Sequence, residues 1–275
     1  MNSNLLNNLN SPECIKASDI ANWLLACGIS SVTTDGLSAM LGIPVNQVPQ
    51  RMASLKRRGR IVTPAEGLWI PVPPEYSTWG APPAIEIIDS IMRHMNTEYY
   101  VGWLSAADLH GASHHAPQVF QVATSRAIRA REVGRSRFKF YQRAHIGHVA
   151  LMKVETRSGM VSVASRETTL MDVANDIAIV GGIDNTANII IELCDTTEPD
   201  IEELVALSEY YPVAAARRLG YLMETFTEVS GLEKLFGAIA KRRAALSLLD
   251  PQAGHRGLIN MVWKIRINRE VSPDV

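Results

Sequence analysis

Apolar residues recur at helical spacing in the N-terminal part of the chain. Residues 18–27 carry apolar side chains on one face, after a serine that can cap a helix, and this predicts a first helix. Leu37, Met40 and Leu41 fall at positions i, i+3 and i+4, which predicts a second helix. Gly42 is expected to end it, because glycine readily adopts the left-handed conformation common just past a helix.

A third helix is predicted from about residue 45. Pro49 would lie in its first turn, where the missing N–H has no intrahelical partner. Val48, Met52 and Leu55 follow at i, i+4 and i+7 and are expected to face the core. The opposite face is polar, with side chains able to hydrogen-bond to base edges or phosphates. These side chains are Gln47, Gln50, Arg51 and Ser54.

Two strand-like runs follow the third helix. Residues 60–63 and 68–72 flank a Pro-Ala-Glu-Gly turn, which predicts a hairpin. Three helices and a hairpin in this order are the layout of a winged helix-turn-helix, which points to DNA. Basic residues end the third helix and enter the hairpin: Lys56, Arg57, Arg58 and Arg60. We expect DNA contacts from these residues, from the polar face and from Thr34.

The polar helix face also has a plainer interpretation. Any surface helix shows one, and cations at a helix C-terminus are favoured by the helix dipole. Winged helices also serve as protein-interaction modules. The pattern therefore predicts the fold more directly than it predicts DNA binding.

The remainder of the chain predicts a larger second domain. At 275 residues the chain is long enough for two domains, and the Pro- and Gly-rich residues 71–83 are the expected linker. We place a winged helix-turn-helix domain at 1–78 and an α+β domain at 79–275. That domain should have a small sheet and a helical second half. Helices are predicted at 84–95, 105–111, 166–180, 185–193, 200–208, 213–227 and 231–249, and strands at 119–123, 138–144, 148–154, 160–164 and 261–267.

Charge is unevenly distributed along a chain whose net charge is -1. Eight acids and no Lys or Arg lie between Asp184 and Glu209. An earlier stretch is basic and contains only one acid, Glu132. Its cations are Arg126, Arg129, Arg131, Arg135, Arg137, Lys139 and Arg143. They predict a second surface that can approach polyanions, unless the acidic stretch folds back and neutralises it.

Composition and N-terminal pattern favour a cytoplasmic protein. Three cysteines, at positions 14, 27 and 194, lie far apart and show no metal-binding or disulfide spacing. The first residues lack a basic region followed by an apolar run, so no signal peptide is expected. No apolar stretch reaches membrane length, and no cofactor motif is present.

Few residues offer catalytic or metal-binding chemistry. His110, His114 and His115 invite a metal-site interpretation, but no carboxylate lies between the first two and the segment resembles a loop, so no metal is expected. Asp172 and Asp176 share one face of a predicted helix, where they could hold a divalent ion or act as acid and base, but such pairs more often form a solvated face. Without a nucleophile elbow or a phosphate loop, the sequence does not predict an enzyme.

Seven segments, taken in order, resemble the AbiEi family of antitoxins. Near the N-terminus they are LGIP and LKRRGRI around the third predicted helix. Further on they are YVGWLSAADLHGASHHAPQVFQVAT, VGRSRFKFYQR, SRETTLMDVA, GGIDNTANIIIEL and the closing WKIRINREV. The resemblance is one of pattern over length, because none of these motifs is catalytic.

The resemblance implies the regulator half of a bicistronic toxin–antitoxin, or abortive-infection, operon of type IV-like organisation. Such a protein binds inverted repeats in its own promoter as a monomer or dimer and represses the operon. Its C-terminal domain counters a toxin, usually nucleotidyltransferase-like, with or without direct contact. The alternative function is a nucleic-acid-modifying enzyme targeted by the winged helix, with Glu167, Asp172 and the histidines as its site.

Overall fold

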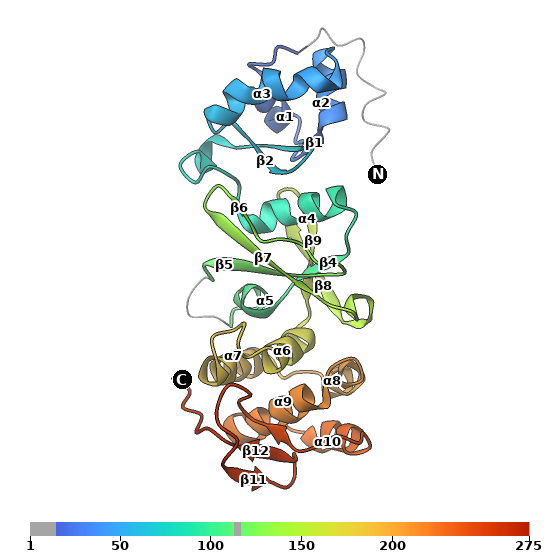
Figure 1. The fold of residues 1–275 in the computed structure, drawn as a ribbon, viewed down its shortest axis with the longest axis vertical. Coiled ribbons are helices and arrows are strands. Elements are labelled where there is room, and N and C mark those ends of the chain that lie inside the picture. The colour runs from blue at the N-terminus through green and yellow to red at the C-terminus, as the bar shows by residue number, and fades with distance from the viewer. Residues whose placement is uncertain (1–14, 113–116, 275) are drawn as a thin grey trace. The chain divides into compact units, whose positions relative to one another are not determined.

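A computed structural model of the chain describes residues 15–112 and 117–274. It has a mixed α/β fold with several sheets, as the sequence predicts, and its elements follow one another as drawn in Figure 1. The described residues form two compact units. The first comprises residues up to Thr97 together with 130–138 and 155–160, and the second contains the remainder.

Three helices and three short strands begin the first unit. They are α1 (Ile20–Ala26), β1 (Val32–Thr33), α2 (Thr34–Leu41), α3 (Val48–Arg57), β2 (Ile61–Ala65) and β3 (Leu68–Pro71), with a 3-10 turn at Val45–Gln47 before α3. The strands pair antiparallel in the order β1-β3-β2. One core, which includes Ile20, Leu37, Met52 and Ile61, joins the helices to the sheet. The apolar spacing predicted the three helices and the β2–β3 hairpin, but it did not predict β1.

Thr33 and Gly42 set the two ends of α2. The Thr33 side chain accepts a hydrogen bond from the backbone N–H of Gly36 at 3.1 Å, so Thr33 is the N-cap. Gly42 has φ 63°, the left-handed conformation predicted for the residue after the helix. The Ser38 hydroxyl donates to the carbonyl oxygen of Ile43 at 2.6 Å and holds the turn that leads to α3.

The first unit continues through the proline-rich segment to α4 (Ala84–His94). This helix buries Ile87, Ile88, Ile91 and Met92. Residues 71–83 contain one 3-10 turn, Pro74–Tyr76. They belong to the first unit, so independent folding of residues 1–78 stays a prediction.

Six strands form the largest sheet, in the order β6-β7-β5-β4-β9-β8. Their bounds are β4 (Tyr99–Val101), β5 (Val119–Thr124), β6 (Arg131–Val133), β7 (Ser136–Gln142), β8 (Leu151–Thr156) and β9 (Gly159–Ala164). In the second unit β4 pairs antiparallel with β5 and parallel with β9. The sequence did not predict β4 or β6, because three residues are too few to show an alternating pattern.

The second unit is completed by six helices and a small sheet among the described residues. They are α5 (Trp103–Leu109), α6 (Arg166–Asn175), α7 (Ile183–Thr196), α8 (Ile201–Ser208), α9 (Val213–Phe226) and α10 (Leu232–Ala240), with β10 (Ser247–Leu248), β11 (Leu258–Asn260) and β12 (Ile265–Ile267). In the small sheet β12 lies between β10 and β11. Figure 1 shows α9 and α10 beside this sheet.

Three predicted elements of the second unit are shorter than expected. The helix predicted at 166–180 ends at Asn175, and the one predicted at 231–249 ends at Ala240. The final strand, predicted at 261–267, begins only at Ile265. None of the described helices is long and apolar enough to cross a membrane.

Candidate nucleic-acid interface and a buried charged cluster

Helix α3 has one buried face and one polar face. Val48 and Met52 are fully buried and Leu55 nearly so. Pro49 lies in the first turn, as predicted. The polar residues predicted to contact DNA are all exposed: Gln47, Gln50, Arg51 and Ser54. The structure therefore gathers these four side chains on the solvent side of one short helix.

The basic residues after α3 divide into two groups. Lys56, Arg57 and Arg58 are exposed and make no ion pair within the described part of the chain. Arg60 is half-buried, and its Nη2 donates to Oδ1 of Asn22 on α1 at 2.5 Å. Arg60 therefore ties the start of β2 to α1 and is less free than its neighbours to contact a phosphate.

Thr34 is also engaged inside the unit. Its hydroxyl accepts a hydrogen bond from Nε1 of Trp69 at 2.9 Å and lies 3.4 Å from the carbonyl oxygen of Gly67. These contacts join the first turn of α2 to the β2–β3 hairpin. Thr34 thus positions α2 against the hairpin, and its contact with DNA stays a prediction.

Two side chains of the same unit contact backbone carbonyl oxygens of the β2–β3 hairpin. His94 on α4 places Nε2 2.7 Å from the carbonyl oxygen of Glu66, and Nη1 of Arg131 donates to the carbonyl oxygen of Pro64 at 2.6 Å. Burial lowers the pKa of Arg131. Gly67, with φ 77°, allows the tight turn between the strands.

The second predicted basic group does not face solvent as a whole. Arg126, Arg129, Arg135, Arg137 and Lys139 are exposed. Among them, Arg137 pairs with Glu132 at 3.3 Å, and Lys139 lies 5.3 Å from the ring centre of Tyr141. The prediction is wrong for two members of this group, Arg131 and Arg143. Arg131 donates a hydrogen bond to the carbonyl oxygen of Pro64, and Arg143 pairs with an acid inside the second unit.

The acidic stretch finds partners elsewhere in the second unit. Asp184 pairs with Arg269, and Glu202 pairs with Lys234 at 2.6 Å. Arg143 pairs instead with Asp172 and Asp176, which precede the acidic stretch.

Asp172 lies at the centre of a buried charged cluster. Its carboxylate accepts hydrogen bonds from the hydroxyls of Tyr211 at 2.8 Å and Tyr100 at 3.1 Å, and Nη2 of Arg143 lies 3.4 Å away. The same Arg143 nitrogen binds Asp176, whose carboxylate also accepts from Nε1 of Trp103 at 3.0 Å. We call Tyr100, Trp103, Arg143, Asp172, Asp176 and Tyr211 the Asp172 cluster.

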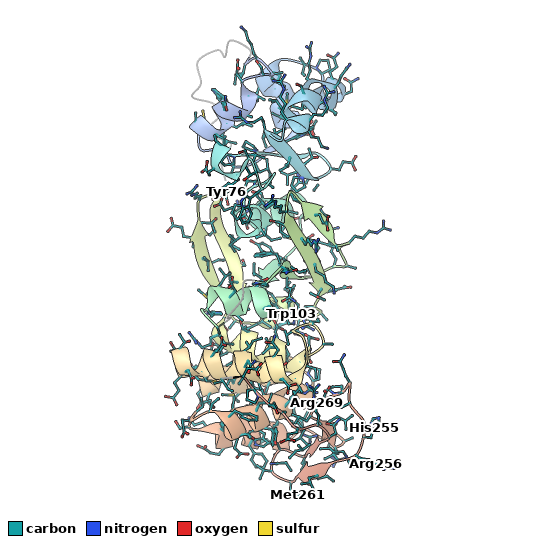
Figure 2. All side chains as sticks on the ribbon, turned by 90° about the vertical axis from the view of Figure 1, so that its left-hand side faces the viewer. Tyr76, Trp103, His255, Arg256, Met261 and Arg269 are labelled. Carbon is teal, nitrogen blue, oxygen red and sulfur yellow. The ribbon has the colours of Figure 1, made fainter. Side chains whose placement is uncertain are left out.

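The cluster overturns the expectation that Asp172 and Asp176 form a solvated face. Asp172 is 0% exposed because α6 is packed on all sides, by α5, α7, α8 and α9. Gly102 admits this packing, since a Cβ there would lie 3.2 Å from Oδ2 of Asp172. Figure 2 labels Trp103, which is fully buried beside the helices.

Burial and neighbouring charges shift the pKa values of the cluster residues. Burial raises the pKa of Asp172 to about 6, although Arg143 and the two tyrosine hydroxyls oppose the shift. Burial alone would lower the pKa of Arg143, but Asp172 and Asp176 together raise it above its ordinary value. Burial and the charge of Asp172 raise the pKa values of Tyr100 and Tyr211. Arg143 therefore stays charged, and Asp172 is ionised only above mildly acidic pH.

The other candidate residues show no assembled metal or catalytic site. Nε2 of His110 lies 2.9 Å from the carbonyl oxygen of Ala164, and burial lowers the pKa of this histidine. His114 and His115 lie outside the described residues. Across the described ranges, no group of three or more His, Cys, Asp or Glu side chains is placed to hold a metal ion. Glu167 is buried and accepts from the backbone N–H of Asp200 at 3.0 Å.

Comparison with known proteins defines the class of the second unit. Residues 100–225 match the model of the AbiEi antitoxin C-terminal domain, and this range contains every member of the Asp172 cluster. The match supports an antitoxin role for this region. Residues 100–225 thus carry the AbiEi antitoxin C-terminal domain, the family that the sequence motifs resemble.

Solved structures extend the comparison to the whole fold. The crystal structure of the RV2827C protein from Mycobacterium tuberculosis is similar with a TM-score of 0.67 and 18% identity, over 90% of each chain. An antigenic nucleotidyltransferase-like protein from Paracoccidioides brasiliensis matches at a TM-score of 0.29 and 9% identity, over 46% of this chain and 89% of that one. Comparison with curated proteins found no match.

Proposed function

We propose that this protein is a cytoplasmic, DNA-binding autorepressor and antitoxin of a bicistronic toxin–antitoxin operon. Residues 1–78 would form a winged helix-turn-helix domain and 79–275 the antitoxin domain. The polar face of α3 carries the proposal, because it stands opposite a fully buried face and leads into three unpaired cations. A helix of this kind enters the major groove, while the β2–β3 hairpin serves as the wing.

The target DNA follows from the same geometry and the family resemblance. One α3 helix of 10 residues reads only a few base pairs, so inverted repeats bound by two copies would supply the length of sequence that specificity needs. The operator is therefore proposed to be a pair of inverted repeats in the protein's own promoter. Binding to two half-sites would take two monomers or one dimer.

The proposed partner of the antitoxin domain is a nucleotidyltransferase-like toxin. The family match supports a toxin partner, and the nucleotidyltransferase class comes from the resemblance noted in the sequence. Within residues 15–112 and 117–274, no feature favours the alternative enzyme. Its acid and base candidates, Glu167 and Asp172, are buried and hydrogen-bonded to Asp200 and to two tyrosines. A gel-shift with and without divalent ions tests the choice, since binding without turnover of the DNA supports the repressor.

Arg51→Ala tests whether α3 reads bases. If Arg51 binds a base edge, operator affinity should fall by about 1–3 kcal/mol, and affinity for random DNA should fall less. Fluorescence anisotropy with both duplexes measures the two effects. Arg157→Ala is the control, because it removes an exposed cation that pairs with Glu75 in the same unit. Equal losses on both duplexes would assign Arg51 to a phosphate, and no loss on either would contradict the docking of α3.

Lys56→Ala, Arg57→Ala and Arg58→Ala test the basic end of α3. A residue that binds a phosphate should, when replaced, lower affinity similarly for all sequences and reduce the slope of log affinity against log salt by about 0.9. Anisotropy titrations at several salt concentrations measure this slope. Lys234→Ala, on the exposed side of α10, is the charge-matched control. Unchanged slopes in all three variants would show that these cations only stabilise the end of the helix.

A further inference from the structure

The turn after α10 and the loop before β12 line a pocket in the second unit. Every charged residue of its lining is a cation. The lining consists of Ala240, Arg242, Arg243, Ala244, Ala245 and Lys264, and we call it the α10 pocket. It lies outside residues 100–225, so the family match does not include it.

The three lining cations are held differently. Arg242 is anchored, because its guanidinium donates to the carbonyl oxygens of Ser208 and Tyr211, the latter at 3.2 Å. Arg243 and Lys264 are exposed, and their side chains have no hydrogen bond or ion pair among the residues that the structure describes. Two cations are thus available to a ligand beside one that is already fixed.

Lys264 is held in an unusual backbone conformation. Its φ is 49°, in the left-handed region that L-residues other than glycine and asparagine rarely occupy. Its carbonyl oxygen accepts from the backbone N–H of Ser247 at 3.1 Å, which fixes the residue beside the turn that carries Arg243. Such strain persists where the surrounding structure enforces it, and it is common at binding sites.

A further positive charge lies under the pocket. Arg217 on α9 is 3% exposed, and its guanidinium donates to the carbonyl oxygens of Ala245 at 2.5 Å and Ala244 at 3.5 Å. Its other partner is the hydroxyl of Ser247 at 3.1 Å, so no carboxylate among the described residues neutralises it. Burial lowers the pKa of Arg217. Two residues of the pocket lining are therefore bound by a buried cation that has no counter-ion among the described residues.

The sequence around the pocket contains no free acid that could act as a counter-ion to these cations. Residues 241–249 and 251–269 contain no Asp or Glu. Asp250, between them, already binds Arg269 at 3.3 Å and the backbone N–H of Gln252 at 2.8 Å. Cations that line one pocket repel one another unless an anion compensates them. The favourable effect of cations on the C-terminus of α10 accounts for Arg242, but it does not account for Lys264 or Arg217.

We propose that the α10 pocket binds a small anion of the diphosphate or polyphosphate class, free or carried by a nucleotide. A phosphate group offers several strong acceptors and more than one negative charge, which suits one guanidinium and one ammonium converging from two loops. Arg243 and Lys264 bind the phosphate oxygens, Arg242 holds the turn in place, and Arg217 raises the local positive potential. This site is distinct from the DNA-contacting face of α3.

Isothermal titration calorimetry of the full chain with inorganic pyrophosphate, and separately with ATP, tests the proposal in low salt without divalent ions. One saturable site per chain is expected, and its affinity should fall as salt increases. Arg243→Gln and Lys264→Asn should each weaken binding about tenfold or more, because each removes a charge-assisted hydrogen bond. Asparagine tolerates the positive φ of position 264, so this variant keeps the backbone.

Lys241→Gln is the matched control, since it removes an exposed cation from the same turn that does not line the pocket. Its affinity should stay within about twofold of the original protein, and circular dichroism should show the same fold for all three variants. Absence of saturable binding to the original protein would overturn the proposal, as would an equal loss in the control.

Binding of a twelve-nucleotide single strand through Arg243, without binding of pyrophosphate or ATP, would also overturn it by assigning the pocket to a nucleic-acid backbone. If pyrophosphate and ATP bind equally, the phosphates alone are recognised; tighter binding of ATP assigns the site to nucleotides.

Discussion

Replacing Asp172 by alanine is expected to lower the free energy of unfolding by about 3–5 kcal/mol. The carboxylate accepts from Tyr100 and Tyr211 and pairs with Arg143, all inside the second unit. Alanine would leave two buried hydroxyls without an acceptor and a buried guanidinium with Asp176 as its only carboxylate partner. Chemical denaturation at neutral pH measures the loss, and Asp176→Ala, at a partly exposed position, should cost less.

Asp172→Asn separates the charge of this side chain from its hydrogen bonds. Asparagine keeps an acceptor of the same shape, so it should cost much less than alanine. Because the pKa of Asp172 is raised from 3.8 to about 6 in the folded protein, ionisation of this carboxyl removes stability as pH rises through that window. The asparagine variant has no carboxyl to ionise at this position, so it does not lose stability in this way. Relative to the original protein, it should therefore gain up to about 3 kcal/mol between pH 4 and pH 6.

Denaturant midpoints of both proteins across this pH range provide the measurement. A difference that does not change with pH would show that Asp172 titrates alike in the folded and unfolded states. A difference that changes in the opposite direction would mean that the attraction of Arg143 exceeds the cost of burial. Either result would contradict the raised pKa.

Gly220→Ala is expected to destabilise the second unit by about 2–3 kcal/mol, although alanine is the better helix former by about 1 kcal/mol. Gly220 lies within α9, and a Cβ there would lie 2.2 Å from Cζ3 of Trp263. The indole cannot easily move, because its Nε1 donates to Oε2 of Glu224 at 2.7 Å and its ring packs edge-on against Phe236. Thermal and denaturant unfolding measure the change.

The double variant Gly220→Ala, Trp263→Leu controls for the cause of that loss. A smaller side chain makes room for the new methyl group, so the cost of the alanine should be much lower in the leucine background. If Gly220→Ala instead raises stability, helix propensity outweighs the contact with Trp263 and the close packing of α9 is not as described.

Local patterns predicted α2 and α3 well because each helix has one buried face and a residue that marks one of its ends. Gly42 and Pro49 carry out the roles expected of them, and the apolar spacing identified the core residues. The same method failed for α10, which was expected to continue to residue 249. The residues after Ala240 favour a helix locally, but Arg217 binds the carbonyl oxygens of Ala244 and Ala245 and holds them in another conformation. Such a tertiary contact has no signal in the local sequence.

The Asp172 cluster was missed for a related reason. A helix buried on every side shows no polar face from which its orientation can be read, so two aspartates four residues apart were assigned to solvent. Their partners come from distant segments, because Arg143 directly follows β7 and Tyr211 lies in the turn before α9. The family motifs YVGWLSAADL, VGRSRFKFYQR and SRETTLMDVA contain four of the six cluster residues, and this was the signal available before the fold was known.

The discontinuous make-up of the first unit bears on how the chain is synthesised. Its α3 and hairpin leave the ribosome early, yet Arg131, which supports the hairpin at Pro64, is made much later, and so is Arg157, which pairs with Glu75. Nascent α3 and the hairpin therefore lack these two contacts until residue 160 has been translated. Any fragment that stops before this point carries the residues of α3 but not the supports of the hairpin beside it, so operator binding is best measured on the full chain.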